Sequence, residues 1–134
     1  MDRSHRAFLD GKSFAVAGAS NDREKYGNLV LRKLGASGRE VMPINPKGGT
    51  IEGLDAYASV ADLPRVPESL SVVTPPSVTE QVIKQAIAAG VKNIWMQPGA
   101  VHEGASAEAR AAGINVIDDG ACVLVVLGLE HVPD

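Results

Sequence analysis

The sequence predicts an α/β domain in which helices cover both faces of a mainly parallel sheet. Short apolar segments alternate with segments of helical periodicity along most of the chain. The apolar segments lack the polar–apolar alternation of half-exposed strands, as expected for strands covered on both faces. Glycine or proline follows each predicted strand. We therefore expect a three-layer α/β sandwich, and 134 residues suit one domain over residues 1–134.

The first half of the pattern begins with a buried strand at Phe14–Ala17, which we expect to be central in the sheet. A polar loop over residues 18–28 leads into a helix that runs from Leu29 toward Gly38. Val41–Asn45 predicts the second strand, which the following proline ends.

Residues 46–67 are less regular. Gly48-Gly49 predicts a turn, Thr50–Tyr57 is expected to hold a short edge strand, and Ser59–Leu63 a helical turn.

From residue 70 onward, strands and helices alternate again. The pattern predicts a strand at Leu70–Thr74, a helix from the capping-box pair Ser77 and Glu80 to Gly90, a strand at Asn93–Gln97, a helix at Glu103–Ala112 and a strand at Ile114–Ile117. We assign no element to Ala121–Leu129. Strands separated by helices imply right-handed crossovers and a parallel sheet of at least five strands.

Composition and charge exclude several classes of protein. A net charge of −3 argues against a broad nucleic-acid surface, and no apolar run reaches membrane-spanning length. The lone cysteine cannot form an internal disulfide, and with three scattered histidines it makes a poor metal-ligand set. Residues 1–10 lack the apolar core of a signal peptide. These features favour a cytoplasmic protein.

Ligands of parallel sheets bind beyond the carboxyl ends of the strands. Four strand ends carry conspicuous residues, and together they predict a ligand-binding edge rather than four independent strand stops: Gly18-Ala19-Ser20, Asn45-Pro46-Lys47, Thr74-Pro75-Pro76 and Gln97-Pro98-Gly99.

The loop after the first strand is the candidate phosphate site. Gly18 permits close approach of the backbone, and the following helix offers free N–H groups. We expect a side chain at Gly18 to block the ligand but not folding, because the position would face the ligand. The loop does not match the dinucleotide fingerprint G-x-G-x-x-G, and it carries the cations Arg23 and Lys25.

The second strand end distinguishes between nucleotides. NAD sites place a carboxylate there for the ribose hydroxyls, whereas this sequence has Asn45-Pro46-Lys47. A lysine there favours a phosphorylated ribose, as in coenzyme A (CoA) or NADP. The alternative is that Lys47 is an ordinary surface lysine.

These segments, in this order, resemble the small stand-alone CoA-binding proteins, which are related to the N-terminal domain of the succinyl-CoA synthetase α subunit. The matching segments are residues 16–20, 25–28, 43–47, 51–53 and 95–100. The resemblance implies a Rossmann-like fold with CoA bound across the strand ends.

The resemblance also implies a role for each segment. Gly18, Ala19 and Ser20 would hold the pyrophosphate with Lys25, and Asn45, Pro46 and Lys47 would meet the 3′-phosphate end. Thr74, Pro75 and Pro76 would line the nucleotide or the pantetheine arm, and Gln97, Pro98 and Gly99 would shape the far side. The phosphorylated histidine of the synthetase lies in a second domain, which we do not expect in this chain.

No catalytic constellation emerges from the sequence, so we expect a non-catalytic chain. His5 and His131 are expected at the surface, His102 as a surface or capping residue, Asp118-Asp119 in a turn, and Cys122 as a buried, inert thiol.

Three functions remain open. The first is a binding module for CoA or a short acyl-CoA, without a nucleic-acid or membrane partner. The second is an NADP-dependent reductase that uses Lys47. The third is a subunit of an acyl-CoA ligase-like complex, and a homo-oligomer is also open.

Overall fold

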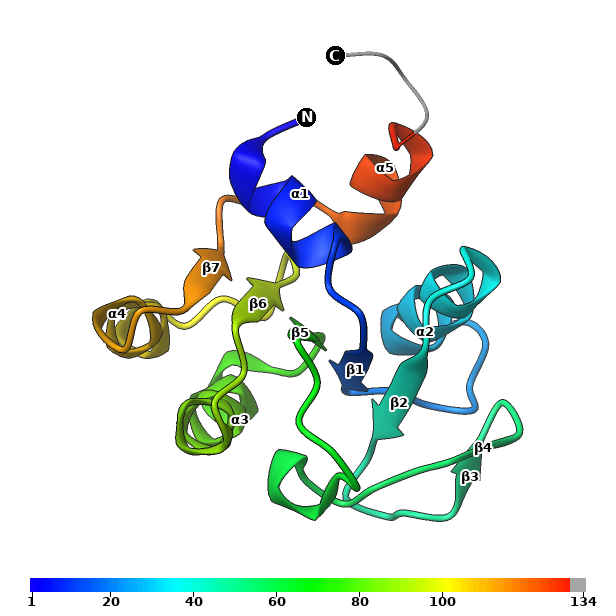
Figure 1. The fold of residues 1–134 in the computed structure, drawn as a ribbon. Coiled ribbons are helices and arrows are strands. Elements are labelled where there is room, and N and C mark those ends of the chain that lie inside the picture. The colour runs from blue at the N-terminus through cyan, green and yellow to red at the C-terminus, as the bar shows by residue number, and fades with distance from the viewer. Residues whose placement is uncertain (131–134) are drawn as a thin grey trace.

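The computed structural model describes residues 1–130, and in this range a five-stranded parallel sheet forms the middle layer (Figure 1). Its strands, in spatial order, are β2 (Val41–Ile44), β1 (Phe14–Ala17), β5 (Ser69–Val72), β6 (Asn93–Met96) and β7 (Asn115–Ile117). The sheet is parallel and has five strands, as predicted. β1 lies inside the sheet between β2 and β5, although the middle strand is β5.

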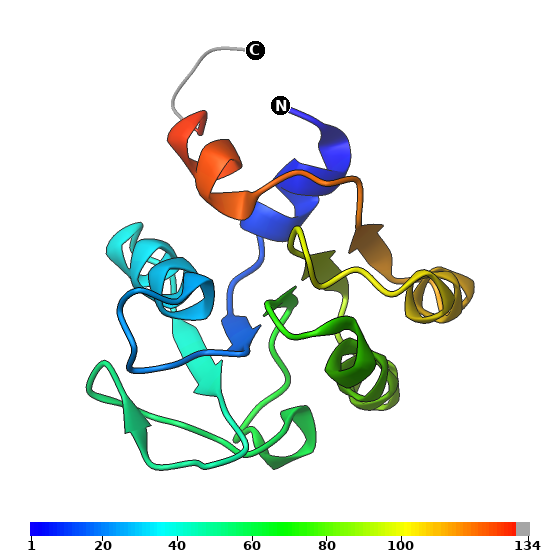
Figure 2. The ribbon, with the colours of Figure 1, turned by 180° about the vertical axis from the view of Figure 1, so that it is seen from behind.

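Helices cover both faces of the sheet (Figure 2). One face packs against α3 (Pro76–Ala89), α4 (Glu103–Ala111) and the 3₁₀ turn η1 (Val60–Asp62). The other face packs against α1 (Arg3–Leu9), α2 (Tyr26–Ala36) and α5 (Val123–Gly128). Consecutive strand residues contribute to opposite faces, which explains the continuous apolar runs: Ile94 and Met96 belong to the first cluster and Trp95 to the second.

Several local predictions need correction. The loop after β1 is shorter than expected, because α2 begins at Tyr26 rather than after residue 28. Ser77 does not cap α3, which begins at Pro76 with Pro75 in the capping position. Proline presets the backbone for the first turn of a helix, so the two prolines define this start. Within the expected edge strand at residues 50–57, β3 (Thr50–Ile51) and β4 (Leu54–Asp55) form a separate two-stranded hairpin, and only Tyr57 bridges to Ile44 at the edge of the main sheet.

The helix α1 lies before the first predicted strand, in a segment for which no element was predicted from the sequence. Its Phe8 is fully buried and makes edge-to-face contacts with Phe14 and Trp95. His5 stacks on Trp95 with ring centroids 4.8 Å apart, and its side chain is only 13% exposed. The expectation that His5 is a surface residue before the fold was therefore wrong.

α5 fills the segment that the sequence left unassigned. Val123 and Val126 complete the core on the α2 side, and Arg39 pairs with Glu130 just beyond the helix. No helix within residues 1–130 has the length and apolar character needed to cross a bilayer.

Candidate functional site

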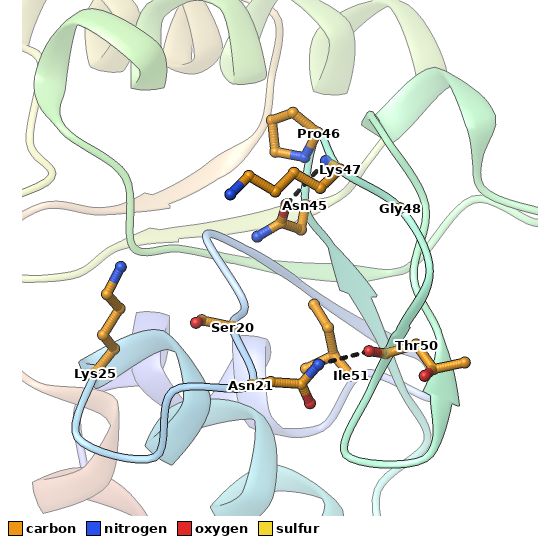
Figure 3. Close-up of a pocket in the computed structure, with 9 residues that line it drawn as sticks. All are labelled: Ser20, Asn21, Lys25, Asn45, Pro46, Lys47, Gly48, Thr50 and Ile51. Carbon is orange, nitrogen blue, oxygen red and sulfur yellow. Dashed lines mark hydrogen bonds between the residues drawn. The ribbon is translucent and has the colours of Figure 1, made fainter.

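A hollow of about 500 Å³ opens where the carboxyl ends of β1 and β2 meet the β3–β4 hairpin (Figure 3). Its lining comes from three segments: Ser20, Asn21 and Lys25 from the β1–α2 loop, Asn45, Pro46, Lys47 and Gly48 from the turn after β2, and Thr50 and Ile51 from β3. The structure thus brings together predicted residues from the first two strand ends.

The turn out of β1 depends on two glycines. Gly18 has a φ of +92°, and a Cβ there would lie 2.3 Å from the carbonyl oxygen of Val73. A Cβ on Gly27 would lie 2.0 Å from the carbonyl oxygen of Gly18. The first turn of α2 therefore packs directly on the end of β1, and only glycine fits at either place. The β5–α3 connection occupies the position that a side chain on Gly18 would take, which corrects the expectation that a side chain there would spare the fold.

The loop amides are partly used within the protein. The N–H groups of Gly18 and Ala19 both donate to the carbonyl of Ile44, at 3.2 and 3.3 Å. By contrast, the first three N–H groups of α2, on Tyr26, Gly27 and Asn28, have no acceptor within residues 1–130. These three donors, and not those of Gly18 and Ala19, lie at the positive end of the helix dipole.

Two lysines reach toward the hollow from opposite sides (Figure 3). Lys25 extends from the start of α2 and Lys47 from the turn after β2, with Ser20 between them; both lysines are exposed. Asn45 fixes this arrangement, because its Nδ2 donates to the carbonyl of Ala19 at 2.9 Å and its Oδ1 accepts from the N–H of Lys47. The region therefore combines positive charge with free backbone donors, as anionic ligands require.

The hairpin closes the outer side of the hollow. Asn21 bridges loop and hairpin, since its Nδ2 donates to the Thr50 carbonyl at 2.7 Å and its Oδ1 accepts from the Glu52 N–H at 3.0 Å. Asn21, Gly48, Thr50 and Ile51 were not among the predicted site residues. The Gly48-Gly49 turn was the signal that could have found the last three, because it leads directly into the hairpin that lines the hollow.

A second, more apolar hollow of about 200 Å³ lies beside the first, and Pro46 lines both. It lies between the ends of β1 and β2 and the helix α3. Its lining includes Gly18, Ile44, Val60, Thr74, Val78 and Val82.

The remaining predicted residues line neither hollow. Ala19 is fully buried. Pro75 and Pro76 are exposed at the start of α3, and Pro98 and Gly99 are exposed beyond β6. Gln97 is also fully buried: its Nε2 donates to Ser71 Oγ, and its Oε1 accepts from the Val123 N–H. Because neither residue is exposed, Ala19 and Gln97 can affect a ligand only by supporting the residues at the carboxyl edge of the sheet.

Cys122 was expected to be a buried, inert thiol, but it is only partly buried, and it has a defined partner. Its Sγ lies within hydrogen-bond distance of the Tyr26 hydroxyl, and that hydroxyl donates to Gln97 Oε1 at 3.2 Å. Burial, reinforced by the contact with Cys122, raises the pKa of Tyr26 above its usual value. This tyrosine is therefore a proton donor in a hydrogen bond rather than a base.

The other titratable candidates have structural contacts. His102 caps α4, with Nδ1 accepting from the Ala105 N–H at 3.0 Å, so the expected capping role is confirmed. Asp118 pairs with Arg110, and Asp119 accepts from the Ala121 N–H within a turn. His131 lies outside the described residues. Residues 1–130 contain no cluster of three or more histidine, cysteine, aspartate or glutamate residues that could hold a metal ion.

Comparison with known proteins supports the fold and the resemblance. The α subunit of ADP-forming acetate–CoA ligase II from Pyrococcus furiosus is 32% identical over 88 residues, which make up 65% of this chain and 19% of that relative. This chain thus spans less than a fifth of that relative's length.

Similar solved structures include one that is matched over nearly its whole length and one that is matched over only part of it. A conserved hypothetical protein from Pyrococcus furiosus has a TM-score of 0.79 and 41% identity, covering 86% of this chain and 98% of its own. The dinucleotide-forming acetyl-coenzyme A synthetase 1 of Ca. Korarchaeum cryptofilum has a TM-score of 0.75 and 28% identity, covering 87% of this chain but 27% of its own.

The CoA-binding domain family matches residues 12–128, from just before β1 to the end of α5. The sheet order, the two glycines at the β1–α2 turn and the cationic strand ends all lie within that match. This chain therefore belongs to the CoA-binding domain family.

Proposed function

We propose that this chain binds coenzyme A, or a short acyl-CoA, along the carboxyl edge of its sheet and does not itself transform it. The observation that carries the proposal is the pair Lys25 and Lys47, which flank a hollow of about 500 Å³ in a member of the CoA-binding domain family.

The pyrophosphate of CoA would lie at the start of α2. The three N–H groups of α2 that have no acceptor within residues 1–130, the Ser20 hydroxyl and the Lys25 ammonium would supply donors and positive charge there. Gly18 and Ala19 would contribute shape rather than hydrogen bonds, because their N–H groups already bond to Ile44.

The adenosine 3′-phosphate would lie on the other side of the hollow, against Asn45, Pro46 and Lys47. The residues present fit a phosphorylated ribose better than the ribose of NAD, because this strand end carries an ammonium and no carboxylate. The smaller apolar hollow beside Thr74 and the surfaces of Pro75 and Pro76 would take uncharged parts of the ligand. Pro98 and Gly99 would contact its far end, supported from below by Gln97.

Binding without turnover fits the contacts of the candidate reactive groups. The ring nitrogen Nδ1 of His102 is used as a helix cap, and Cys122 is hydrogen-bonded to a tyrosine with a raised pKa. Neither forms the nucleophile–base pair that acyl transfer requires.

Calorimetric titration with CoA, NAD and NADP tests the proposal. We expect CoA to bind, NAD to bind much more weakly, and the heat of CoA binding to persist in a Lys92→Ala control, since Lys92 is exposed at the opposite edge of the sheet. NADP binding tighter than CoA binding would favour the reductase alternative and contradict the proposal.

A second role, as part of a ligase-like assembly, is favoured by the match to a ligase α subunit. In that case CoA would be presented to chemistry on another chain or domain. Copurification of a partner that confers CoA-dependent activity on this chain would establish it.

A further inference from the structure

We propose that Glu52 is a positioning residue whose carboxylate, at the tip of the β3–β4 hairpin, holds the β1–α2 loop so that Ser20 and Lys25 face a phosphate-bearing ligand. The inference rests on the proposed function, because CoA supplies the phosphate.

The side chain of Glu52 reaches the loop through Asn28. Glu52 Oε2 accepts from Asn28 Nδ2 at 3.1 Å, and the same Nδ2 donates to the Ser20 carbonyl at 2.7 Å. Asn28 is fully buried, and its Oδ1 accepts from Arg32 Nε at 2.7 Å. A single satisfied amide thus connects the hairpin tip to the backbone of Ser20, and its orientation is fixed from both sides.

The backbone of Glu52 makes a second connection. Its N–H donates to Asn21 Oδ1, one residue beyond Ser20 in the loop. Main chain and side chain of one hairpin residue therefore hold two successive residues of the loop.

The backbone conformation of Glu52 indicates why a glutamate stands there. Its φ of +50° is the only positive value at a non-glycine within residues 1–130, and this region of conformational space suits glycine better. Glycine would relieve the strain but would lack the carboxylate. The contacts to Asn28 and Arg23 are what the glutamate side chain adds.

A carboxylate beside an anion site would repel the ligand unless its charge were balanced. Arg23 supplies the balance, because its Nη2 donates to Glu52 Oε1 at 2.6 Å. This bond, followed by the one from Asn28, lowers the pKa of Glu52, so the acceptor stays ionised at neutral pH. Glu52 can therefore position the loop without opposing the phosphate.

The test compares Glu52→Ala with Glu52→Gln, and uses Asp55→Ala as the matched control because Asp55 is exposed in the same hairpin. We expect Glu52→Ala to weaken CoA binding about tenfold, the loss of one charge-assisted hydrogen bond. Amide exchange at Asp22, Glu24 and Lys25 should become faster, because their turn bonds depend on the held loop. Glu52→Gln should recover most of the affinity, since its carbonyl accepts from Asn28, and Asp55→Ala should match the native protein.

A ligand without the pyrophosphate distinguishes an effect of Glu52 on the β1–α2 loop from a general loosening of the whole site. Adenosine 3′-phosphate should bind the native protein and Glu52→Ala equally, because it lacks the group that the loop would hold. Unchanged CoA affinity in Glu52→Ala would overturn the inference and leave the proposed function standing. Equal losses for CoA and adenosine 3′-phosphate would also overturn it. If the native protein does not bind CoA, the proposed function fails and this inference fails with it.

Discussion

At Gly18 the chain leaves β1 with a φ of +92°, and the Val73 carbonyl occupies the space where a side chain would begin. The residue is therefore required by the contact between two strand ends, although in sequence it looks like part of a phosphate loop. Lys47 is the opposite case. It is exposed, it has no structural contact through its side chain in the described part of the chain, and charge is all that it offers.

We expect Gly18→Ala to destabilise the domain by about 1–3 kcal/mol or more, from left-handed strain together with the close approach of Val73. Urea unfolding measures the loss. Gly90→Ala is the matched control, because Gly90 has a φ of +87° and no atom within 4 Å of the position of its Cβ. Equal losses in the two variants would mean that Val73 contributes nothing.

Lys47→Ala should remove the preference for CoA over dephospho-CoA. The native preference should be about ten- to a hundredfold, since a hydrogen bond to a charged group contributes roughly 1.5–3 kcal/mol. Parallel calorimetric titrations with the two ligands measure it. A native protein that binds both ligands equally would place the 3′-phosphate elsewhere.

At the scale of elements, the regular strands and helices were predictable and the exceptions have physical causes. Strands covered on both faces leave continuous apolar runs, and glycine or proline ends them. The start of α2 was missed because Gly27 and Asn28 look like turn residues, whereas glycine is needed there for contact with Gly18 and Asn28 is buried by its hydrogen bonds. α1 was missed because a seven-residue helix with two buried residues leaves no periodic signal.

Part of the candidate site was also predictable from the sequence. The residues at the ends of β1 and β2 followed from the rule that ligands bind at the carboxyl edge of a parallel sheet, and Ser20, Lys25, Asn45 and Lys47 do gather there. The hairpin residues did not follow, because they come together only when the Gly48-Gly49 turn folds. Burial of Gln97 could not be read from its polar side chain.

Phe8→Ala should destabilise the protein by about 3–5 kcal/mol, as large-to-small substitutions of buried aromatic residues do. The loss would show that α1 is an integral layer of the fold. Chemical unfolding monitored by the fluorescence of Trp95, which Phe8 contacts, measures it. The control Arg3→Ala, on the exposed side of the same helix, should change stability little.

The ion pair between Arg110 of α4 and Asp118 after β7 should make stability depend on pH in acid. The hydrogen bond from Arg110 lowers the pKa of Asp118, so the unfolded chain takes up a proton at this site at a higher pH than the folded protein. The pair stabilises fully above the unfolded pKa, and this contribution is lost as pH falls through the folded pKa.

Arg110→Ala should accordingly reduce the acid dependence below about pH 4 by up to roughly 1 kcal/mol, since the pair is partly exposed. Urea unfolding as a function of pH measures this difference. If the free energy of unfolding falls equally in the native protein and the variant as the pH is lowered, the ion pair contributes nothing to stability.

For the molecule as a whole, strand order places the candidate site. The connection from β1 leads to β2 on one side, whereas the connection from its other neighbour, β5, leads to β6 on the opposite side, so strand order reverses between β1 and β5. The crevice at this reversal is where parallel sheets of this order hold their ligands. The smaller hollow opens at this reversal and the larger one beside it, at the ends of β1 and β2; the described residues around them supply donors and charge but no paired acid and base.

The isolated chain should therefore show no steady-state turnover of acetyl-CoA or NADPH. Thiol release and NADPH absorbance measure the two reactions. A rate that disappears in His102→Ala or Cys122→Ser would contradict the expectation and identify the reactive group.

The same strand order bears on how the chain folds. Phe14 pairs with Ser69 across more than twice the sequence distance that separates Ser69 from Asn93 or Asn93 from Asn115. Closing the longer loop costs more chain entropy, so we expect β5, β6 and β7 to assemble with their helices before β1 joins them. The smaller hollow combines residues from both sides of that late junction, so it forms only after the two halves of the chain have met.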